Sequence, residues 1–573
     1  MLGRRVGEKS GGVRGWPTGF AWTAVCAAWL IVIWTWSALH LAMTVDDTYY
    51  YFKTALNIGR GLGSSFDGIN PTDGYHPLWM ALLALLFKPL PDDIVLLTRI
   101  AFTVQVVMVW AGGLLLSRLR EAGGVRILWP LALVLANPFA AKIVLCGQET
   151  ALQFLLSSGA LAMWWALRAS GRSTAMGYRA IEWAGLAVVC VLATLARLDT
   201  AFFCAALLAM PLVLPSDDER KAGLSARIKR TALGFAVFGG LLGAFLVYRL
   251  VVFHHLMPVS GAIKQHLDDD EVAPLAARGF VIAASLAGMV GFWLAARRRR
   301  ARVLALLAPP IAGALVVATY NFGWRGEMSP SLIRIWYLEP FLLAGVLVVG
   351  ALLAIPGRRL PIRLFFAAAG LWIAATVFSW SYRFESRSYA LYQAAERCSR
   401  WIDRHAEAGA IGAAWDAGFA GAFTRKPVMN LDGLISSWEY KEQYFDRGKV
   451  DEFISTRQPV DFVVQYAWPG TVRGIARRFE REPLPHAPRP QTTVTGTQDR
   501  SALSGRWGVD LASFYVAHVE CVTVSVAYDP TRTVNAAFYF VLTRAGLPGR
   551  LTLAEFALKN QGRASCDGFA YVD

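Results

Sequence analysis

Two adjacent carboxylates, Asp46 and Asp47, follow directly on a long apolar run and precede three tyrosines and a lysine in the stretch TVDDTYYYFK. At a boundary of low dielectric constant, two neighbouring negative charges repel each other strongly. Such a pair can provide a carboxylate of raised pKa, a general base or a metal ligand. The alternative is structural, because an acidic residue at a helix N-terminus caps the helix and complements its dipole. The residues alone leave both interpretations open.

The elements around this pair have the composition of a membrane protein. The chain has 573 residues, of which 55% are hydrophobic and only 17% are charged. Many of its runs approach the roughly 20 apolar residues that cross a bilayer as a helix. The sequence therefore predicts a polytopic α-helical membrane domain over residues 1–381. We expect its spans near 19–43, 94–117, 127–145, 150–168, 181–195, 199–215, 231–252, 279–296, 303–319, 336–355 and 364–381.

The positive charge indicates the topology of this domain. A net charge of +16 could suggest a nucleic-acid-binding protein, but the Lys and Arg residues lie mostly in short clusters between apolar runs. Such clusters hold loops in the cytoplasm, so we expect no nucleic-acid partner. Placing all the clusters there predicts about eleven spans, a cytoplasmic N-terminus and an external C-terminus. The short apolar segment 77–90 is then re-entrant or interfacial, whereas a full crossing would give twelve spans.

This topology puts every chemically unusual loop on the external side. The polar segments are 44–76, 146–149, 196–199, 254–271 and 320–336. Polar groups at one rim of a helix bundle indicate one shared cavity. The largest of these loops, 44–93, begins with an amphipathic pattern over 44–61, with Asp46, Tyr50, Lys53 and Asn57 on one stripe. We expect this segment to be a helix that lies in the membrane interface.

Residues 382–573 are more polar and predict a second, extracytoplasmic domain of mixed α/β structure. The segments AGAIGAAWDAGFAGAF and KPVMNLDGL are typical of strand–loop–helix–strand units, and VDFVVQYAW is typical of a strand. The later segments VECVTVSVAYDP and NAAFYFVLTRAG are richer in strand-forming residues. Asp432 lies in this region, where the residues alone indicate no chemical role for it.

Several of these motifs together resemble a known enzyme family. The stretch DDTYYYFKTALNIGRGLGSSFDGINPTDGYHPLW is similar to the first external loop of the GT-C superfamily of membrane glycosyltransferases. It most resembles the bacterial DD-x-Y type, which includes mycobacterial terminal arabinofuranosyltransferases. Aminoarabinose transferases and protein O-mannosyltransferases are more distant relatives. GQETAL, LARLD, PVSGAIK, WY-x-x-P and the C-terminal IGAAWDAGFAGAF…VMNLDGL also fit, so the resemblance spans most of the chain.

The resemblance implies a GT-C fold and an inverting transfer of a monosaccharide, such as arabinofuranose or another pentose or hexose. The donor would be a polyprenyl-phosphate sugar and the acceptor a cell-envelope glycan, lipid or protein. The protein would lie in the bacterial cytoplasmic membrane and act on its outer face. It also implies that Asp46 or Asp47 is the catalytic carboxylate. We assign Asp46 as the base and Asp47 as its support, or the reverse, because the reaction needs a base for the acceptor hydroxyl.

The departing phosphate needs external cations. Lys264 in SGAIK and Arg334, close to Tyr337, are the candidates, and a guanidinium grips phosphate oxygens in a two-point fork. The structural alternative for Lys264 is a lysine that snorkels to the interface. Tyr50, on the stripe of Asp46, and Tyr337 complete the candidate substrate contacts at these two places.

Three further charged places interrupt or border apolar runs: His76, Glu149 and the pair Arg197 and Asp199. Charges at such depth normally pair or face a cavity. They are therefore candidates for substrate binding, and the alternative is a bridge from Arg197 to Asp199 or Glu149 that fixes helix packing.

The sequence predicts no firm cofactor. A divalent cation is possible, but there is no D-x-D motif and adjacent aspartates diverge, so metal independence is favoured. A transporter or flippase for lipid-linked glycans, a non-catalytic envelope scaffold, and a transferase for another lipid-phosphate donor remain as alternatives. A transporter usually shows internal repeats and broken helices at mid-membrane, whereas the polar groups here lie at one rim.

Overall fold

The fold described here comes from a computed structural model. It describes residues 16–119, 127–169, 176–264, 302–319, 338–353, 387–467, 515–524 and 535–543. The predicted spans 279–296 and 364–381, the domain boundary at 381/382, and the candidate residues Arg334 and Tyr337 lie outside these ranges. For them the predictions stand as made.

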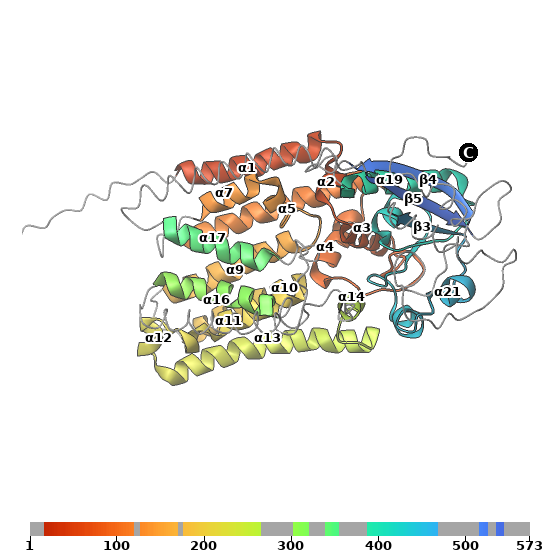
Figure 1. Cartoon of the computed structure of the whole chain (residues 1–573). Coiled ribbons are helices and arrows are strands. Elements are labelled where there is room, and N and C mark those ends of the chain that lie inside the picture. The colour runs from red at the N-terminus through yellow and green to blue at the C-terminus, as the bar shows by residue number, and fades with distance from the viewer. Residues whose placement is uncertain are drawn as a thin grey trace, which may run out of the picture.

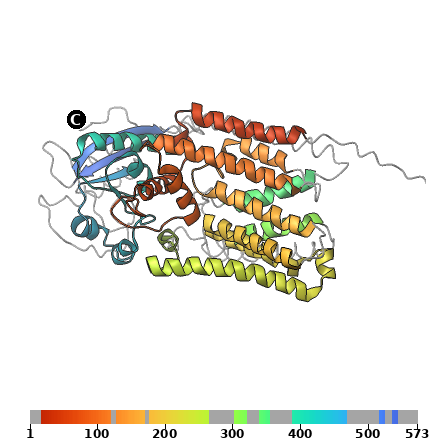
Figure 2. The same ribbon diagram turned by 180° about the vertical axis from the view of Figure 1, so that it is seen from behind.

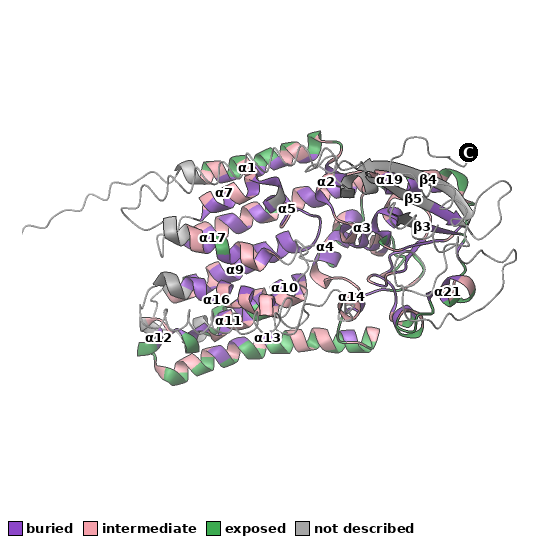
Figure 3. Ribbon diagram, in the orientation of Figure 1, coloured by how far each residue is buried: buried purple, intermediate pink, exposed green. Residues whose placement is uncertain are grey.

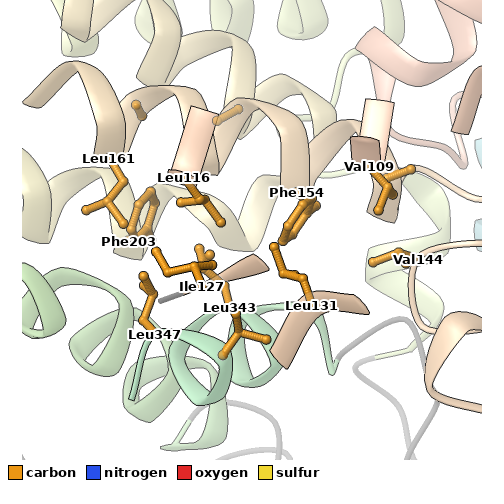
Figure 4. Packing of buried hydrophobic residues seen from close by; sticks show 14 of the residues in the cluster. Val109, Leu116, Ile127, Leu131, Val144, Phe154, Leu161, Phe203, Leu343 and Leu347 are labelled. Carbon is orange, nitrogen blue, oxygen red and sulfur yellow. The ribbon is translucent and has the colours of Figure 1, made fainter. Parts of the chain in front are cut away.

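Long apolar helices run side by side and form a bundle, with the C-terminal region at one end of it (Figures 1 and 2). Buried apolar side chains from four helices meet in its interior, among them Leu116, Phe154, Phe203 and Leu343 (Figure 4). The bundle helices are α1 (Trp16–Thr35), α5 (Ile94–Ser117), α7 (Leu128–Ala136), α9 (Thr150–Ala169), α10 (Met176–Ala196), α11 (Ala201–Val213), α13 (Gly223–Phe253), α16 (Arg302–Ala318) and α17 (Glu339–Leu353).

Among the described residues, α5, α9 and α13 are long and apolar enough to cross a membrane, and six shorter apolar helices accompany them. The predicted span 94–117 coincides with α5. The predicted span 127–145 is instead divided, because Pro138 cannot continue α7, and a short helix α8 (Pro138–Ala141) follows. The chain is thus an integral membrane protein, and the number of eleven spans stays a prediction.

Helix α13 lies at the outside of the bundle, where many of its residues are exposed (Figure 3). Only 11% of the most apolar 18-residue stretch of α13 is buried inside the protein. Its exposed side chains include apolar ones such as Val247 and Val251. An exposed apolar face of this kind suits contact with lipid. Arg249 on the same helix is buried, so its charge must be satisfied inside the protein.

Short helices lie between the bundle and the C-terminal region: α2 (Leu39–Met43), α3 (Asp46–Gly59), α4 (Pro77–Phe87) and α14 (Val259–Ile263) (Figures 1 and 2). Helix α3 confirms the helix expected over 44–61. Its first turn carries Asp46 and Asp47, which favour a helix N-terminus, and Thr48 Oγ1 accepts the backbone N–H of Val45. The residue that caps α3 is therefore Val45, and neither aspartate is the N-cap.

The interfacial placement expected for α3 stays a prediction. Its polar stripe packs on protein: the ammonium of Lys53 donates to the carbonyl of Thr424, and the amide of Asn57 donates to the carbonyls of Ser65 and Phe66. The stripe that resembles a solvated face is thus a docking face, mainly for the C-terminal region.

The C-terminal region contains a five-stranded mixed sheet in the order β2-β1-β3-β5-β4. Strands β1, β2 and β3 are parallel, whereas β5 runs antiparallel to β3 and β4. This confirms the predicted fold class, a polytopic α-helical membrane protein with a mixed α/β C-terminal part. The elements are α19 (Arg387–His405), β1 (Gly412–Ala414), α20 (Ala417–Phe423), β2 (Val428–Asn430), α21 (Val450–Glu452), β3 (Phe462–Ala467), β4 (Tyr515–Val524) and β5 (Asn535–Thr543).

The β1–α20–β2 unit determines which residues face α3. Because β1 and β2 are parallel, their carboxyl ends lie at the same edge of the sheet. Asp416 follows β1 and Asp432 follows β2, so both acidic residues lie at that edge. The carboxyl edge of parallel strands is where ligand sites of such sheets are found.

Candidate functional site

Asp46 is held by the start of α20. Its Oδ2 accepts the backbone N–H of Gly418, and its Oδ1 accepts that of Phe419, both at 2.9 Å. These are two of the first N–H groups of α20, which have no partner within their own helix. A Cβ atom at position 418 would overlap the carbonyl oxygen of Asp46, so only glycine allows this approach. The carboxylate is therefore fixed in orientation by a segment far along the chain.

Tyr50, one turn further along α3, forms a second link to the same segment. Its hydroxyl donates to Asp432 Oδ2 at 3.0 Å and accepts from Asn430 Nδ2 at 2.9 Å and from the Ala417 N–H at 3.2 Å. Asp432 also accepts the backbone N–H of Leu434. The Tyr50 hydroxyl thus makes three hydrogen bonds to the carboxyl edge of β1 and β2.

Asp47 points to the other side, towards Lys264. The Lys264 Nζ and Asp47 Oδ2 atoms are 3.7 Å apart, and each side chain is 21% exposed. Lys264 directly follows α14 and caps its C-terminus. Residues from two loops that lie far apart in the sequence are thus in contact.

The other described candidates form one network, in which Arg197 and Glu149 are buried. Arg197 Nη1 lies 2.8 Å from Glu149 Oε1, Arg197 Nε lies 3.0 Å from Asp199 Oδ1, and His76 Nε2 lies 3.6 Å from Glu149 Oε1. Both bridges considered for Arg197 are therefore present. His76 Nδ1 and Glu149 Oε2 are buried without a hydrogen-bond partner in the described part of the chain. Such atoms can accept or donate to a substrate hydroxyl.

Electrostatic effects connect this network to the acidic pair. Burial lowers the pKa of His76, Glu149 opposes that shift, and the charges of Arg197 and Lys264 add to it. Burial alone would raise the pKa of Glu149, but His76 and Arg197 hold it below its usual value. The charge of Lys264 therefore acts on His76 as well as on Asp47, its ion-pair partner.

The pKa of Asp46 shifts in the direction that a general base requires. Burial raises it well above the usual carboxyl range, the nearby charge of Asp416 raises it further, and the N–H groups of Phe419 and Gly418 partly oppose this. A base is most effective when its pKa approaches the working pH.

Three carboxylates at or beside this site have no role in the sequence-based interpretation. Asp416 and Asp432 lie at the sheet edge, and burial raises the pKa of Asp432. Glu339, the first residue of α17, is 1% exposed and its Oε1 has no partner among the described residues. It acts electrostatically with Arg197 and Asp199. A charge at the start of an apolar run was the available signal for Glu339, whereas the other two required the tertiary structure.

Trp438 and Trp415 of the C-terminal region have different environments. The Trp438 ring stacks on His255 at 3.6 Å between centroids, so that face is occupied by protein. Trp415 precedes Asp416, and its indole Nε1 is buried without a hydrogen-bond partner in the described ranges. Within those same ranges, no group of three or more His, Cys, Asp or Glu side chains is placed to hold a metal ion.

No protein-family model matches the chain, and no curated protein matches it. Solved structures similar to it include the apo oligosaccharyltransferase of Archaeoglobus fulgidus, with 11% identity, a TM-score of 0.48 and coverage of 96% of this chain and 78% of that one. ArnT from Cupriavidus metallidurans bound to undecaprenyl phosphate shows 13% identity and a TM-score of 0.48, with 92% and 99% covered. The oligosaccharyltransferase AglB from Archaeoglobus fulgidus, in complex with an inhibitory peptide and a dolichol-phosphate, shows 13% identity and a TM-score of 0.43, with 95% and 78% covered.

Proposed function

We propose that this protein is a GT-C glycosyltransferase that moves a monosaccharide from a polyprenyl-phosphate carrier to an acceptor of the cell envelope. The observation that carries the proposal is the meeting of Asp47 with Lys264, beside Asp46. A carboxylate pair next to a cation matches the two needs of the reaction, a base for the acceptor and a positive charge for the departing phosphate. The motifs of the first external loop support the same assignment.

In the proposed reaction, Asp46 accepts the proton of the acceptor hydroxyl. The acceptor oxygen forms a bond to the anomeric carbon while the bond from that carbon to the phosphate oxygen breaks, and polyprenyl phosphate leaves with the electron pair. Each Asp46 oxygen keeps a lone pair beyond its hydrogen bond to α20, so the carboxylate is oriented and still basic. Lys264 carries the positive charge that meets the phosphate, and Asp47 holds its ammonium group in place.

The network of His76, Glu149 and Arg197 suits the sugar. Planar charged groups that hold one another in place can bind neutral hydroxyls. Two of these side chains, His76 and Glu149, offer a buried polar atom that has no partner within the described ranges. The acceptor, the sugar and the location on the outer face of a bacterial cytoplasmic membrane belong to the same proposal. The motif type leaves the sugar open between arabinofuranose and another pentose or hexose.

The test uses purified protein in lipid nanodiscs with a radiolabelled polyprenyl-phosphate sugar and an envelope glycan extract. The proposal predicts label in the glycan with wild-type protein, and loss of transfer in Asp46→Asn at unchanged expression and melting temperature. Near-normal transfer in both Asp46→Asn and Asp47→Asn would end the assignment of this pair. A glycan transporter would move the intact labelled lipid across a vesicle membrane and leave the sugar–phosphate bond uncut. A scaffold would do neither.

A further inference from the structure

The segment 254–264, which carries Lys264, contains little secondary structure of its own. It leaves α13 at His254, which adopts a left-handed backbone with φ of 61°, and continues into the five-residue helix α14. A helix this short is not stable by itself, so its position depends on contacts with the rest of the protein.

One buried carboxylate, Asp73, binds this segment directly and also binds α13 and the C-terminal region. Asp73 is 2% exposed. Its Oδ1 accepts the backbone N–H of Val259, the first residue of α14, at 3.1 Å. Its Oδ2 accepts from Arg249 Nη2 at 2.5 Å and from the indole Nε1 of Trp438 at 3.3 Å. The Asp73 side chain thus joins α13, α14 and the C-terminal region.

Arg249 makes a further contact near the start of segment 254–264. Its Nε donates to the carbonyl of Leu256 at 2.9 Å, so one guanidinium bridges the turn after α13 and Asp73. The guanidinium is 4% exposed on a helix whose outer face is apolar. The buried positive charge of Arg249 is thus neutralised by Asp73. The hydrogen bonds of Arg249 to Leu256 and of Asp73 to Val259 determine where α14 begins.

The C-terminal region also packs directly on α14. A Cβ at Gly74 would overlap the carbonyl oxygen of Leu434, and a Cβ at Gly433 would overlap the side chain of Ile263. The Ile263 end of α14 is thus packed on the loop that also contains Asp432. The position of Lys264 is coupled to the docking of this region.

We propose that Asp73 is a positioning residue that sets Lys264 against Asp47, and that Trp438 makes this placement depend on the docked C-terminal region. The role as a phosphate-binding cation rests on the proposed function, whereas the placement of Lys264 does not. A purely structural role would be to neutralise Arg249. These two roles predict different behaviour of Lys264 when Asp73 is changed.

The first measurement needs no ligand. The rate at which an amine-acylating reagent modifies Lys264 is followed by peptide mass spectrometry, with Lys449, which is 52% exposed, as the internal reference. Asp73→Asn is expected to increase the Lys264 rate several-fold relative to Lys449. The matched control is Glu219→Gln, which removes a buried carboxylate beside Arg168. Glu219 belongs to α12 (Asp217–Lys221), which lies at the opposite end of the bundle from α14 (Figure 1). The control is expected to lower the melting temperature without changing the Lys264 rate.

The second measurement is the affinity of the same variants in nanodiscs for undecaprenyl phosphate. Asp73→Asn is expected to weaken binding roughly tenfold, the factor that corresponds to one lost hydrogen bond to a charged group. Trp438→Phe keeps an aromatic ring at this position but removes the N–H donor together with part of the indole ring system, so it serves as a second variant if Asp73→Asn does not fold. Trp438→Phe is expected to increase the Lys264 modification rate and to weaken binding of undecaprenyl phosphate, each by less than Asp73→Asn does.

The outcomes separate the two ideas. Unchanged Lys264 reactivity and unchanged affinity in Asp73→Asn and Trp438→Phe would overturn the inference. Increased Lys264 reactivity with no binding of undecaprenyl phosphate by wild-type protein would support the placement role and contradict the proposed donor. Equal effects of Glu219→Gln and Asp73→Asn on Lys264 would show a general loss of stability and would also overturn the inference.

Discussion

The hydroxyl of Tyr50 donates a hydrogen bond of 3.0 Å to Asp432, which lies 382 residues further along the chain. This bond joins α3 to the carboxyl edge of the C-terminal sheet. Together with the two N–H groups that bind Asp46, it makes the C-terminal region part of the site. Loss of the C-terminal contacts would therefore disturb Asp46, the carboxylate that we propose as the base, directly.

Tyr50→Phe tests this link. The substitution leaves the buried carboxylate of Asp432 short of one donor, so we expect the free energy of unfolding to fall by about 1–3 kcal/mol. Thermal unfolding in detergent provides the measurement. In a double-mutant cycle with Asp432→Asn, the two changes should show a coupling energy of about 0.5–3 kcal/mol. Strictly additive effects would contradict a direct interaction.

Gly418→Ala tests the approach of α20 to Asp46. The added methyl group would overlap the carbonyl oxygen of Asp46, so α20 must move away and its N–H groups lose the carboxylate. We expect transfer to fall roughly tenfold or more, the factor for one lost hydrogen bond to a charged group. Gly409→Ala is the matched control, because a Cβ there meets no atom within 4 Å. Equal activity of the two variants would show that α20 does not orient Asp46.

Asp416→Asn tests the electrostatics of the base. Burial and the charge of Asp416 raise the pKa of Asp46, and the base acts in its ionised form, so activity falls as the pH drops through this raised value. Removing the Asp416 charge lowers the pKa of Asp46, and the acid limb of the kcat/KM profile should move to lower pH. Glu407→Gln, an exposed residue of the same region, should leave the limb in place. A shift to higher pH in Asp416→Asn would contradict Asp46 as the base.

Arg197→Met tests the buried ion network. The change leaves Glu149, which is 2% exposed, without its principal positive partner, and breaking such a buried pair costs about 3–5 kcal/mol. We expect a lower melting temperature and loss of transfer. The double variant with Glu149→Gln should recover part of the stability, because no uncompensated charge then remains at that contact. No recovery would show that Arg197 acts mainly through other partners.

The sequence indicates most of the architecture because composition alone determines much of it. Apolar runs of sufficient length predict α5 and α9 almost to the residue, and strand-forming residues predict β3, β4 and β5. The sequence also indicates the bridge from Arg197 to Glu149 and Asp199, since charges in apolar surroundings must pair.

The contacts of the site with distant segments could not be predicted in the same way. The polar stripe of α3 has the pattern of a solvated helix face, and only tertiary structure shows that it is covered by α20. Asp73 lies in a sequence typical of a turn, and its bonds to Arg249 and Trp438 depend on segments far away in the chain. Local patterns contain no information about which distant backbone N–H or indole meets a given carboxylate.

A structure of the protein with undecaprenyl phosphate, determined by electron cryomicroscopy in nanodiscs, tests the central claim most directly. The account predicts lipid density between the helices that ends in a phosphate at hydrogen-bonding distance, about 2.7–3.2 Å, from Lys264 Nζ and beside Asp46 and Asp47. A phosphate bound elsewhere, with Lys264 and the two aspartates facing only protein, would contradict it.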